Sequence, residues 1–146
     1  MKRSTKYPDT PTFHYYNANP KGRITGDCTV RAICTALGYS YEYVVRDLAE
    51  LQCETGYDAK DLIELIMQKY GWHKMRQPRK ADNTKYTGKE FCKVQQKGLA
   101  KDGIKISSRI VSMIGCHHIV AIIDGKVNDI WDSTDGCIGN YWVRFK

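Results

Sequence analysis

The sequence predicts an α+β fold in which an N-terminal helical part packs on a small C-terminal antiparallel sheet. Three observations support this prediction. Apolar residues between positions 28 and 71 recur at helical spacing, residues 109–114 and 118–123 are rich in β-branched side chains, and Asp124-Gly125 is typical of a two-residue hairpin turn. Because the helices precede the strands in the chain, we expect two layers of one α+β domain.

Chain length and composition fit a single compact domain with its own core. The chain has 146 residues, of which 42% are hydrophobic and 27% are charged. We expect residues 26–146 to form this domain and residues 1–25, rich in Pro, Asn, Thr and Tyr, to form an extended arm. No stretch approaches the ~20 apolar residues of a membrane span, and no apolar segment typical of a secretory signal follows the basic N-terminus. A cytoplasmic location is therefore expected.

Three helices are expected first, each bounded by residues that favour helix ends. The first ends at Gly38, the second lies between a Ser40 cap and Gly56, and the third lies between an Asp58 cap and Gly71. Their buried faces are expected to carry these side chains: Val30, Ile33, Cys34 and Leu37; Val44, Val45, Leu48 and Leu51; Leu62, Ile63, Leu65, Ile66 and Tyr70.

The second half of the chain is expected to contain one short helix and the strands. Residues 72–86 are predicted to be a basic loop, and Thr87-Gly-Lys-Glu90 matches a capping box that begins a helix through Phe91 and Val94. Strands are predicted over 109–114, 118–123, 126–131 and 141–145, with the hairpin turn joining the second to the third.

One of the six cysteines differs from the others in its position. An even count can indicate disulfides, but the chain has ample apolar residues and no Cys-x-x-Cys pair, so we expect most of its thiols to be reduced. Cys28 lies where a loop meets the first helix. Free N–H groups and the positive end of the helix dipole favour a thiolate there and can stabilise an oxyanion. The alternative is a buried structural cysteine.

A thiolate nucleophile needs a base and a group that orients the base. If the turn is at 124–125, Ile123 pairs with Lys126, and the pairing brings His118 opposite Trp131 and diagonal to Asp129. This places His118, Val120, Ile122, Val127, Asp129 and Trp131 on one face. The same register sets His117 opposite Asp132 on the other face, and this rival pair stays open.

Two motifs resemble those of the papain-like cysteine peptidases, in particular small papain-fold proteins of phage and bacterial genomes. The first is Asp27-Cys28-Thr29-Val30-Arg31-Ala32, which matches Asp-Cys-x-x-Arg-Ala. The second runs from His118 to Asp132 and matches His-x-x-Ala-x-x-Asp-Gly-x-x-x-Asp-x-Trp-Asp. The resemblance extends from about Asp27 to Ser133, and residues 72–108 match no motif. It implies a papain-like fold with Cys28 as nucleophile, His118 as base and Asp129 as the third member of a triad.

The chain departs from the family pattern at the oxyanion hole. Papain-like enzymes often carry a Gln about six residues before the cysteine, where this sequence has Gly22. Asn17, Asn19 and Asp27 are the candidates to replace it.

These observations predict a cysteine hydrolase that acts on an amide, isopeptide or thioester bond of a protein or peptide without a cofactor. An acyl transferase or transglutaminase-like enzyme would use the same residues. Phage origin, which the resemblance suggests, would place the protein in a host cytoplasm, acting on a host or phage protein. A metal site at Cys116-His117-His118 with Cys28 or Asp129 is a weaker alternative, because consecutive strand residues point to opposite faces.

A binding function is the second class of hypothesis. The net charge is +7, and much of the excess lies within 69–105. This segment is expected to bind an acidic partner or nucleic acid, with Trp72, Tyr86 and Phe91 able to stack on bases, or else to be a solvated surface. An inactive or non-enzymatic papain-fold protein would bind a host protein or nucleic acid in this way.

Overall fold

A computed structural model of the chain describes residues 2–97 and 107–144. Within these residues it has the α+β architecture that the sequence predicts, with five helices and one six-stranded sheet. The elements in chain order are α1 (Arg3–Lys6), β1 (Phe13–Tyr15), α2 (Cys28–Leu37), α3 (Tyr41–Thr55), α4 (Ala59–Lys69), β2 (His73–Met75), α5 (Gly88–Lys97), β3 (Arg109–Ile114), β4 (His118–Ile123), β5 (Lys126–Asp129) and β6 (Ile138–Val143).

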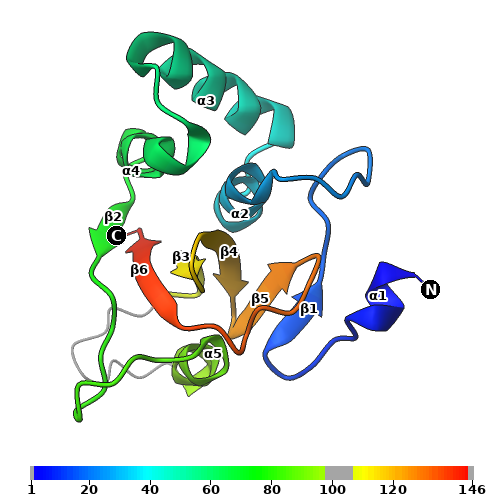
Figure 1. Cartoon of the computed structure of the whole chain (residues 1–146), viewed down its shortest axis with the longest axis vertical. Helices are drawn as coiled ribbons and strands as arrows, with labels where there is room; N and C mark the ends of the chain where they lie inside the picture. The colour runs from blue at the N-terminus through cyan, green and yellow to red at the C-terminus, as the bar shows by residue number, and fades with distance from the viewer. Residues whose placement is uncertain (1, 98–106, 145–146) are drawn as a thin grey trace.

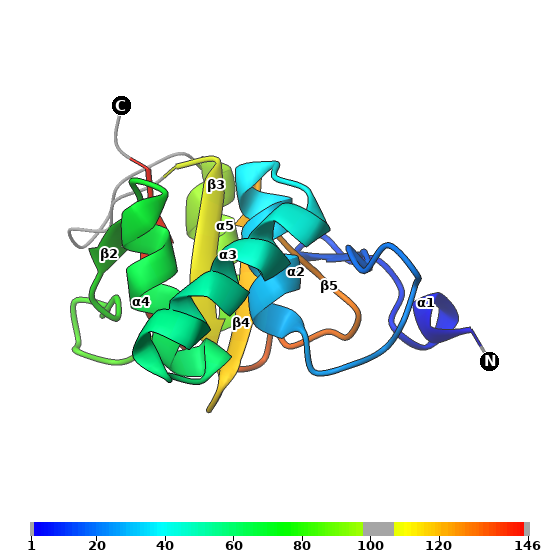
Figure 2. The same ribbon diagram turned by 90° about the horizontal axis from the view of Figure 1, so that it is seen from above.

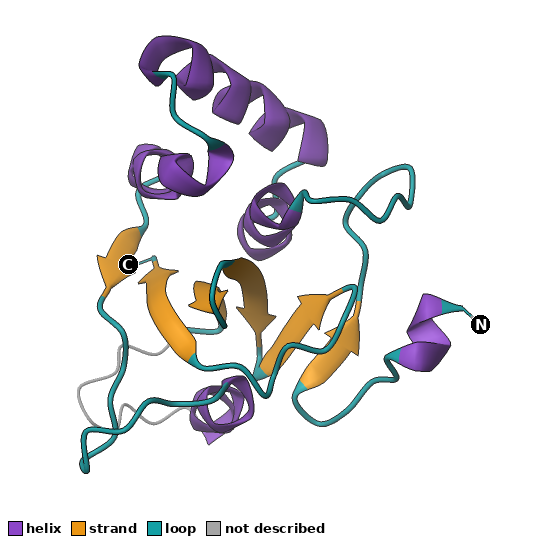
Figure 3. Cartoon of the chain, viewed as in Figure 1, coloured by secondary structure: helices purple, strands orange, loops and turns teal. Residues whose placement is uncertain are grey.

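The sheet is the central layer and is mostly antiparallel. Its strand order is β1-β5-β4-β3-β6-β2, and β1 is parallel to β5. Helices α2, α3 and α4 cover one face, and α5 covers the other (Figures 1 and 2). Figure 3 shows the sheet between these helical layers, with α1 beside its β1 edge.

Alternation along the central strands divides the core into two clusters. Ile119 and Ala121 of β4 pack with α2, α3 and α4, whereas Val120 and Ile122 pack with α5. Successive strand side chains point to opposite faces, so β4 contributes to both sides. The central strand is therefore buried on both faces and forms a rigid base for the residues at its ends.

The helix boundaries agree with the local sequence signals. Gly38 and Gly56 end α2 and α3 in left-handed conformations that glycine adopts without strain. Ser40 caps α3 through a hydrogen bond from the Tyr43 N–H. Thr87 and Glu90 form the predicted capping box, each backbone N–H donating to the other side chain. Val45, expected on the buried face of its helix, is instead exposed.

The hairpin forms in the predicted register, and two strand boundaries differ. Ile123 pairs with Lys126 and Ile122 pairs with Val127, across a turn in which Asp124 and Gly125 both have positive φ. The returning strand β5 ends at Asp129 rather than 131. The last strand, β6, spans 138–143 rather than 141–145, and position 145 lies outside the described residues.

Two short strands occur where the sequence indicated none. β2 lies within the expected loop 72–86 and pairs with β6. β1 lies within the expected N-terminal arm and pairs with β5, and its Phe13 is completely buried. Phe13 is thus part of the core, because pairing with a distant strand supplies the order that three residues lack alone. No helix in the described ranges is long and apolar enough to cross a bilayer.

Candidate active site

Cys28, His118 and Asp129 converge from the ends of three elements. Cys28 is the first residue of α2, His118 the first of β4 and Asp129 the last of β5. β4 and β5 are the two strands of the hairpin, so His118 and Asp129 lie at the same end of it, away from the turn. Helix α2 packs across β4, which brings the start of the helix to that end.

The His118–Asp129 contact is a short hydrogen bond in a buried setting. His118 Nε2 lies 2.5 Å from Asp129 Oδ2, and Asp129 is 1% exposed. The Trp131 ring lies beside the imidazole, with 5.0 Å between the ring centroids. Because the carboxylate binds Nε2, Nδ1 is the ring nitrogen that can accept the proton of the thiol.

The thiol of Cys28 interacts with the His118 ring and with the backbone N–H of Ile119. Burial by itself would raise the pKa of this thiol, but these interactions and the positive charges of His118 and Arg31 outweigh burial and lower the pKa below its usual value. Burial likewise acts to lower the pKa of His118, but hydrogen bonds to Asp129 and Cys28 raise it to about 9. Both changes favour a thiolate–imidazolium pair near neutral pH.

Arg31, one turn along α2 from Cys28, connects the two sides of this site. Its Nη1 lies 2.5 Å from Asp129 Oδ1, and its Nε lies 2.7 Å from Asp27 Oδ1. Asp27 also accepts hydrogen bonds from Tyr41 Oη at 2.7 Å and from Asn19 Nδ2 at 3.1 Å. Burial opposes ionisation of Asp27, yet these hydrogen bonds hold its pKa below the usual value.

The three candidates for the oxyanion hole all make hydrogen bonds within the loop that precedes α2. Asn19 donates to Asp27, and Asn17 donates to the carbonyl of Arg23 at 3.0 Å while accepting from the Asn19 N–H. Asp27 is an ionised acceptor and therefore cannot donate a hydrogen bond to an oxyanion. The groups that can do so are the backbone N–H of Ile119, which already meets the thiol, and the first-turn N–H groups of α2, to which Asp27 makes no side-chain cap.

No hydrogen bond joins His117 to Asp132 among the described residues, in contrast to His118 and Asp129. His117 is exposed on the turn before β4, and Asp132 Oδ1 accepts from Thr134 N and Oγ1 at 3.0 and 2.5 Å. Cys116 is exposed on the same turn. Within the described residues, no three side chains of His, Cys, Asp or Glu gather in a way that could hold a metal ion.

A cavity of about 390 Å³ adjoins the site on the His118 side. It is lined by His118, Trp131, Asp132 and Ser133 among others. The hydroxyl of Ser133 is buried, and it has no hydrogen-bond partner within the described residues.

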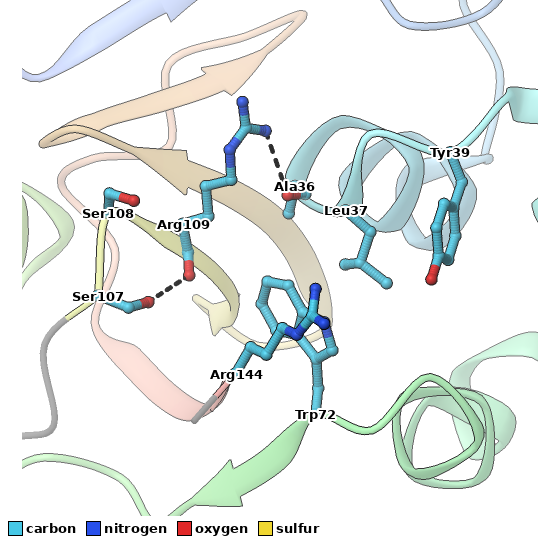
Figure 4. A pocket seen from close by; sticks show the side chains of 8 residues that line it. All are labelled: Ala36, Leu37, Tyr39, Trp72, Ser107, Ser108, Arg109 and Arg144. Carbon is cyan, nitrogen blue, oxygen red and sulfur yellow. Dashed lines mark hydrogen bonds between the residues drawn. The ribbon is translucent and has the colours of Figure 1, made fainter. Parts of the chain in front are cut away.

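A second cavity lies far from the thiol. It measures about 560 Å³ and lies at the C-terminal end of α2, beside Ala36, Leu37 and Trp72 (Figure 4). There Arg109 Nη1 donates to the carbonyl of Ala36 at 3.2 Å. Cys28 is at the opposite end of the same helix, so this cavity is separate from the triad.

The aromatic residues of the basic segment are not available to stack on bases. Trp72, Tyr86 and Phe91 are 8%, 5% and 0% exposed and belong to the core. The sequence hypothesis of a stacking platform is therefore wrong for these three rings, because helical and strand contacts bury them. Part of the basic segment, 98–105, lies outside the described residues.

In comparisons with protein-family models, curated proteins and solved structures, none matched the chain.

Two groups of the candidate site were not identified from the sequence. Arg31 was part of a motif without an assigned role, although its spacing of four from Asp27 is typical of a helical ion pair. The Ile119 N–H carries no sequence signal, because every residue but proline has one.

Proposed function

We propose that the chain is a papain-like cysteine hydrolase acting on an amide, isopeptide or thioester bond. The observation that supports this is the array of Cys28, His118 and Asp129, in which the thiol meets the imidazole and the imidazole meets a buried carboxylate. A nucleophile, a base and a group that orients the base are the parts that acyl transfer through a thiol requires.

In the proposed reaction, Cys28 Sγ attacks the substrate carbonyl carbon. A C–S bond forms, and the carbonyl π electrons move to oxygen, where backbone N–H groups at the start of α2 can stabilise the oxyanion. The intermediate collapses as the bond to the leaving group breaks, and the imidazolium of His118 protonates that group. The product at this stage is a thioester on Cys28.

Water completes hydrolysis of the thioester. His118 takes a proton from the water, the hydroxide adds to the acyl carbon, and the thiolate leaves as the carboxylic acid is released. An amine in place of water would give acyl transfer from the same intermediate. Asp129 keeps Nδ1 of His118 directed at the thiol throughout by holding Nε2.

The proposal is tested by the pH dependence of alkylation. Iodoacetamide labelling, with each cysteine quantified by peptide mass mapping, should show Cys28 reacting well below pH ~8.5, where an ordinary thiol ionises. His118→Gln should shift Cys28 labelling to higher pH. Cys53, exposed at the end of α3, is the internal reference thiol whose profile should not change. An ordinary profile for Cys28 in the unaltered protein would rule out the proposed nucleophile.

A further inference from the structure

Arg31 is a buried cation held by carboxylates from two separate parts of the fold. Its side chain is 7% exposed, and the carboxylates of Asp27 and Asp129 are 10% and 2% exposed. Removing three charges from water is costly unless each is paired. The geometry provides this pairing, because different nitrogens of one planar guanidinium meet the two acids.

The two acids belong to opposite sides of the proposed site. Asp27 directly precedes Cys28, and its other carboxylate oxygen is held by Tyr41 at the start of α3. Asp129 is the last residue of β5, and its Oδ2 is hydrogen-bonded to His118. Its Oδ1 accepts hydrogen bonds from Arg31 and from the Ile130 N–H, the latter at 2.7 Å. A single side chain therefore links the nucleophile's loop to the carboxylate that orients the base.

We propose that Arg31 is a positioning residue, which clamps the loop preceding Cys28 to the end of β5 and thereby holds Asp129 against His118. A role of Arg31 in catalysis rests on the proposed function, but the contacts that form the clamp are present in the free protein. Arg31 meets His118 only through Asp129 among the hydrogen bonds described, so it acts through that carboxylate.

The direction in which the pKa of His118 changes when Arg31 is replaced distinguishes loss of the clamp from simple loss of a positive charge. Asp129 from β5, Cys28 and Arg31 from α2, and His117 and Asp132 beside its cavity surround the ring. Simple loss of a nearby positive charge would raise the pKa of His118. Loss of the clamp would release Asp129, and the pKa of His118 would instead fall from about 9 toward its ordinary 6.5.

The experiment is an NMR titration of the His118 imidazole in the full-length chain, labelled with ¹³C-histidine and assigned through His118→Gln. Arg31→Gln should lower the pKa of His118 by about one unit or more, a tenfold change in its proton affinity. Arg109→Gln is the matched control, because Arg109 donates to carbonyls at the far end of α2. An unchanged or raised pKa in folded Arg31→Gln overturns the proposal.

Arg31→Lys separates geometry from charge and serves if Arg31→Gln does not fold. An ammonium is a compact charge that cannot reproduce the guanidinium fork, so partial recovery of the His118 pKa is expected. Complete recovery would mean that charge alone suffices, and this too overturns the clamp. The readout needs neither a substrate nor a reactive Cys28. Failure of the clamp is thus distinguishable from failure of the proposed hydrolase, which the alkylation profile reports.

Discussion

Asp129 is the residue at which His118 and Arg31 meet. Its two carboxylate oxygens are buried and form hydrogen bonds with an imidazole, a guanidinium and one backbone N–H. A carboxylate can accept hydrogen bonds from all three groups at once. An amide in its place would turn its NH₂ group, which cannot accept, toward at least one of them. The charge and the two-sided acceptor geometry are both needed here.

Replacing Asp129 by Asn should therefore raise the pKa of the Cys28 thiol. The His118 ring loses its ionised partner, so the imidazolium that lowers the thiol pKa is less stable. We expect Cys28 alkylation at about pH 6 to slow by about tenfold or more. Asp132→Asn is the matched control for the rival pair and should leave the rate within about twofold. The opposite ranking of the two variants would favour His117 and Asp132.

The raised pKa of His118 also predicts how stability depends on pH. Because the pKa is about 9 when folded and near 6.5 when unfolded, the imidazolium contributes fully below about pH 6.5. This contribution is lost as pH rises through about 9. In a Cys28→Ser background, the unfolding free energy lost on adding His118→Gln should thus be greater at about pH 6 than at pH 10, by about 2 kcal/mol. Urea titrations at both pH values measure this, and a difference independent of pH would contradict it.

At the scale of elements, helices α2 to α5 were predictable because their signals are local, whereas the four-residue α1 lies in the segment that was expected to be an extended arm. Caps and terminating glycines at Ser40, Gly56 and Thr87 act within one turn, and the structure has the helices where these residues place them. Strands β1 and β2 were not predictable. Each has three residues, and each exists through pairing with a strand from the far end of the chain.

The two N-caps of α3 and α4 offer a matched comparison. Ser40 accepts a hydrogen bond from the Tyr43 N–H, whereas Asp58 makes no side-chain cap. Ser40→Ala should therefore reduce the free energy of unfolding by about 1 kcal/mol. Asp58→Ala should cost only a few tenths of a kcal/mol, through the helix dipole. Chemical denaturation of both variants checks this, and equal losses would show that the capping bond of Ser40 is not the source.

For the whole molecule, β1 joins the N-terminal segment to the core and to the site. Phe13 is fully buried in the cluster on the α5 side, and just past the strand the Tyr16 N–H donates to the carbonyl of Asp129 at 2.9 Å. Phe13→Ala should cost about 3–5 kcal/mol because it leaves a cavity. The exposed neighbour His14→Ala should cost much less. Thermal unfolding measures both, and a small loss for Phe13 would mean that the segment behaves as a separate arm.

The site was predictable from the sequence to the extent that its signals were short-range. Cys28 was singled out by its position at a helix start, and Asp129 by the register of a tight hairpin. The register argument had a limit, however. Val120, Ile122 and Val127 do share the face toward α5, but His118 and Asp129 contact α2, which packs on the other face. His118 and Asp129 lie at the ends of their strands, where the start of α2 supplies their partners Cys28 and Arg31, and hairpin register alone does not predict this packing.

The parallel pairing of β1 with β5 has a consequence for biosynthesis. The ribosome makes Cys28 well before it makes His118, Asp129 and β5, the strand that pairs with β1. Until those residues are made, Arg31 and the thiol have no partners from β4 or β5. The proposed thiolate–imidazolium pair would therefore form only after β4 and β5 have been made and have packed against α2.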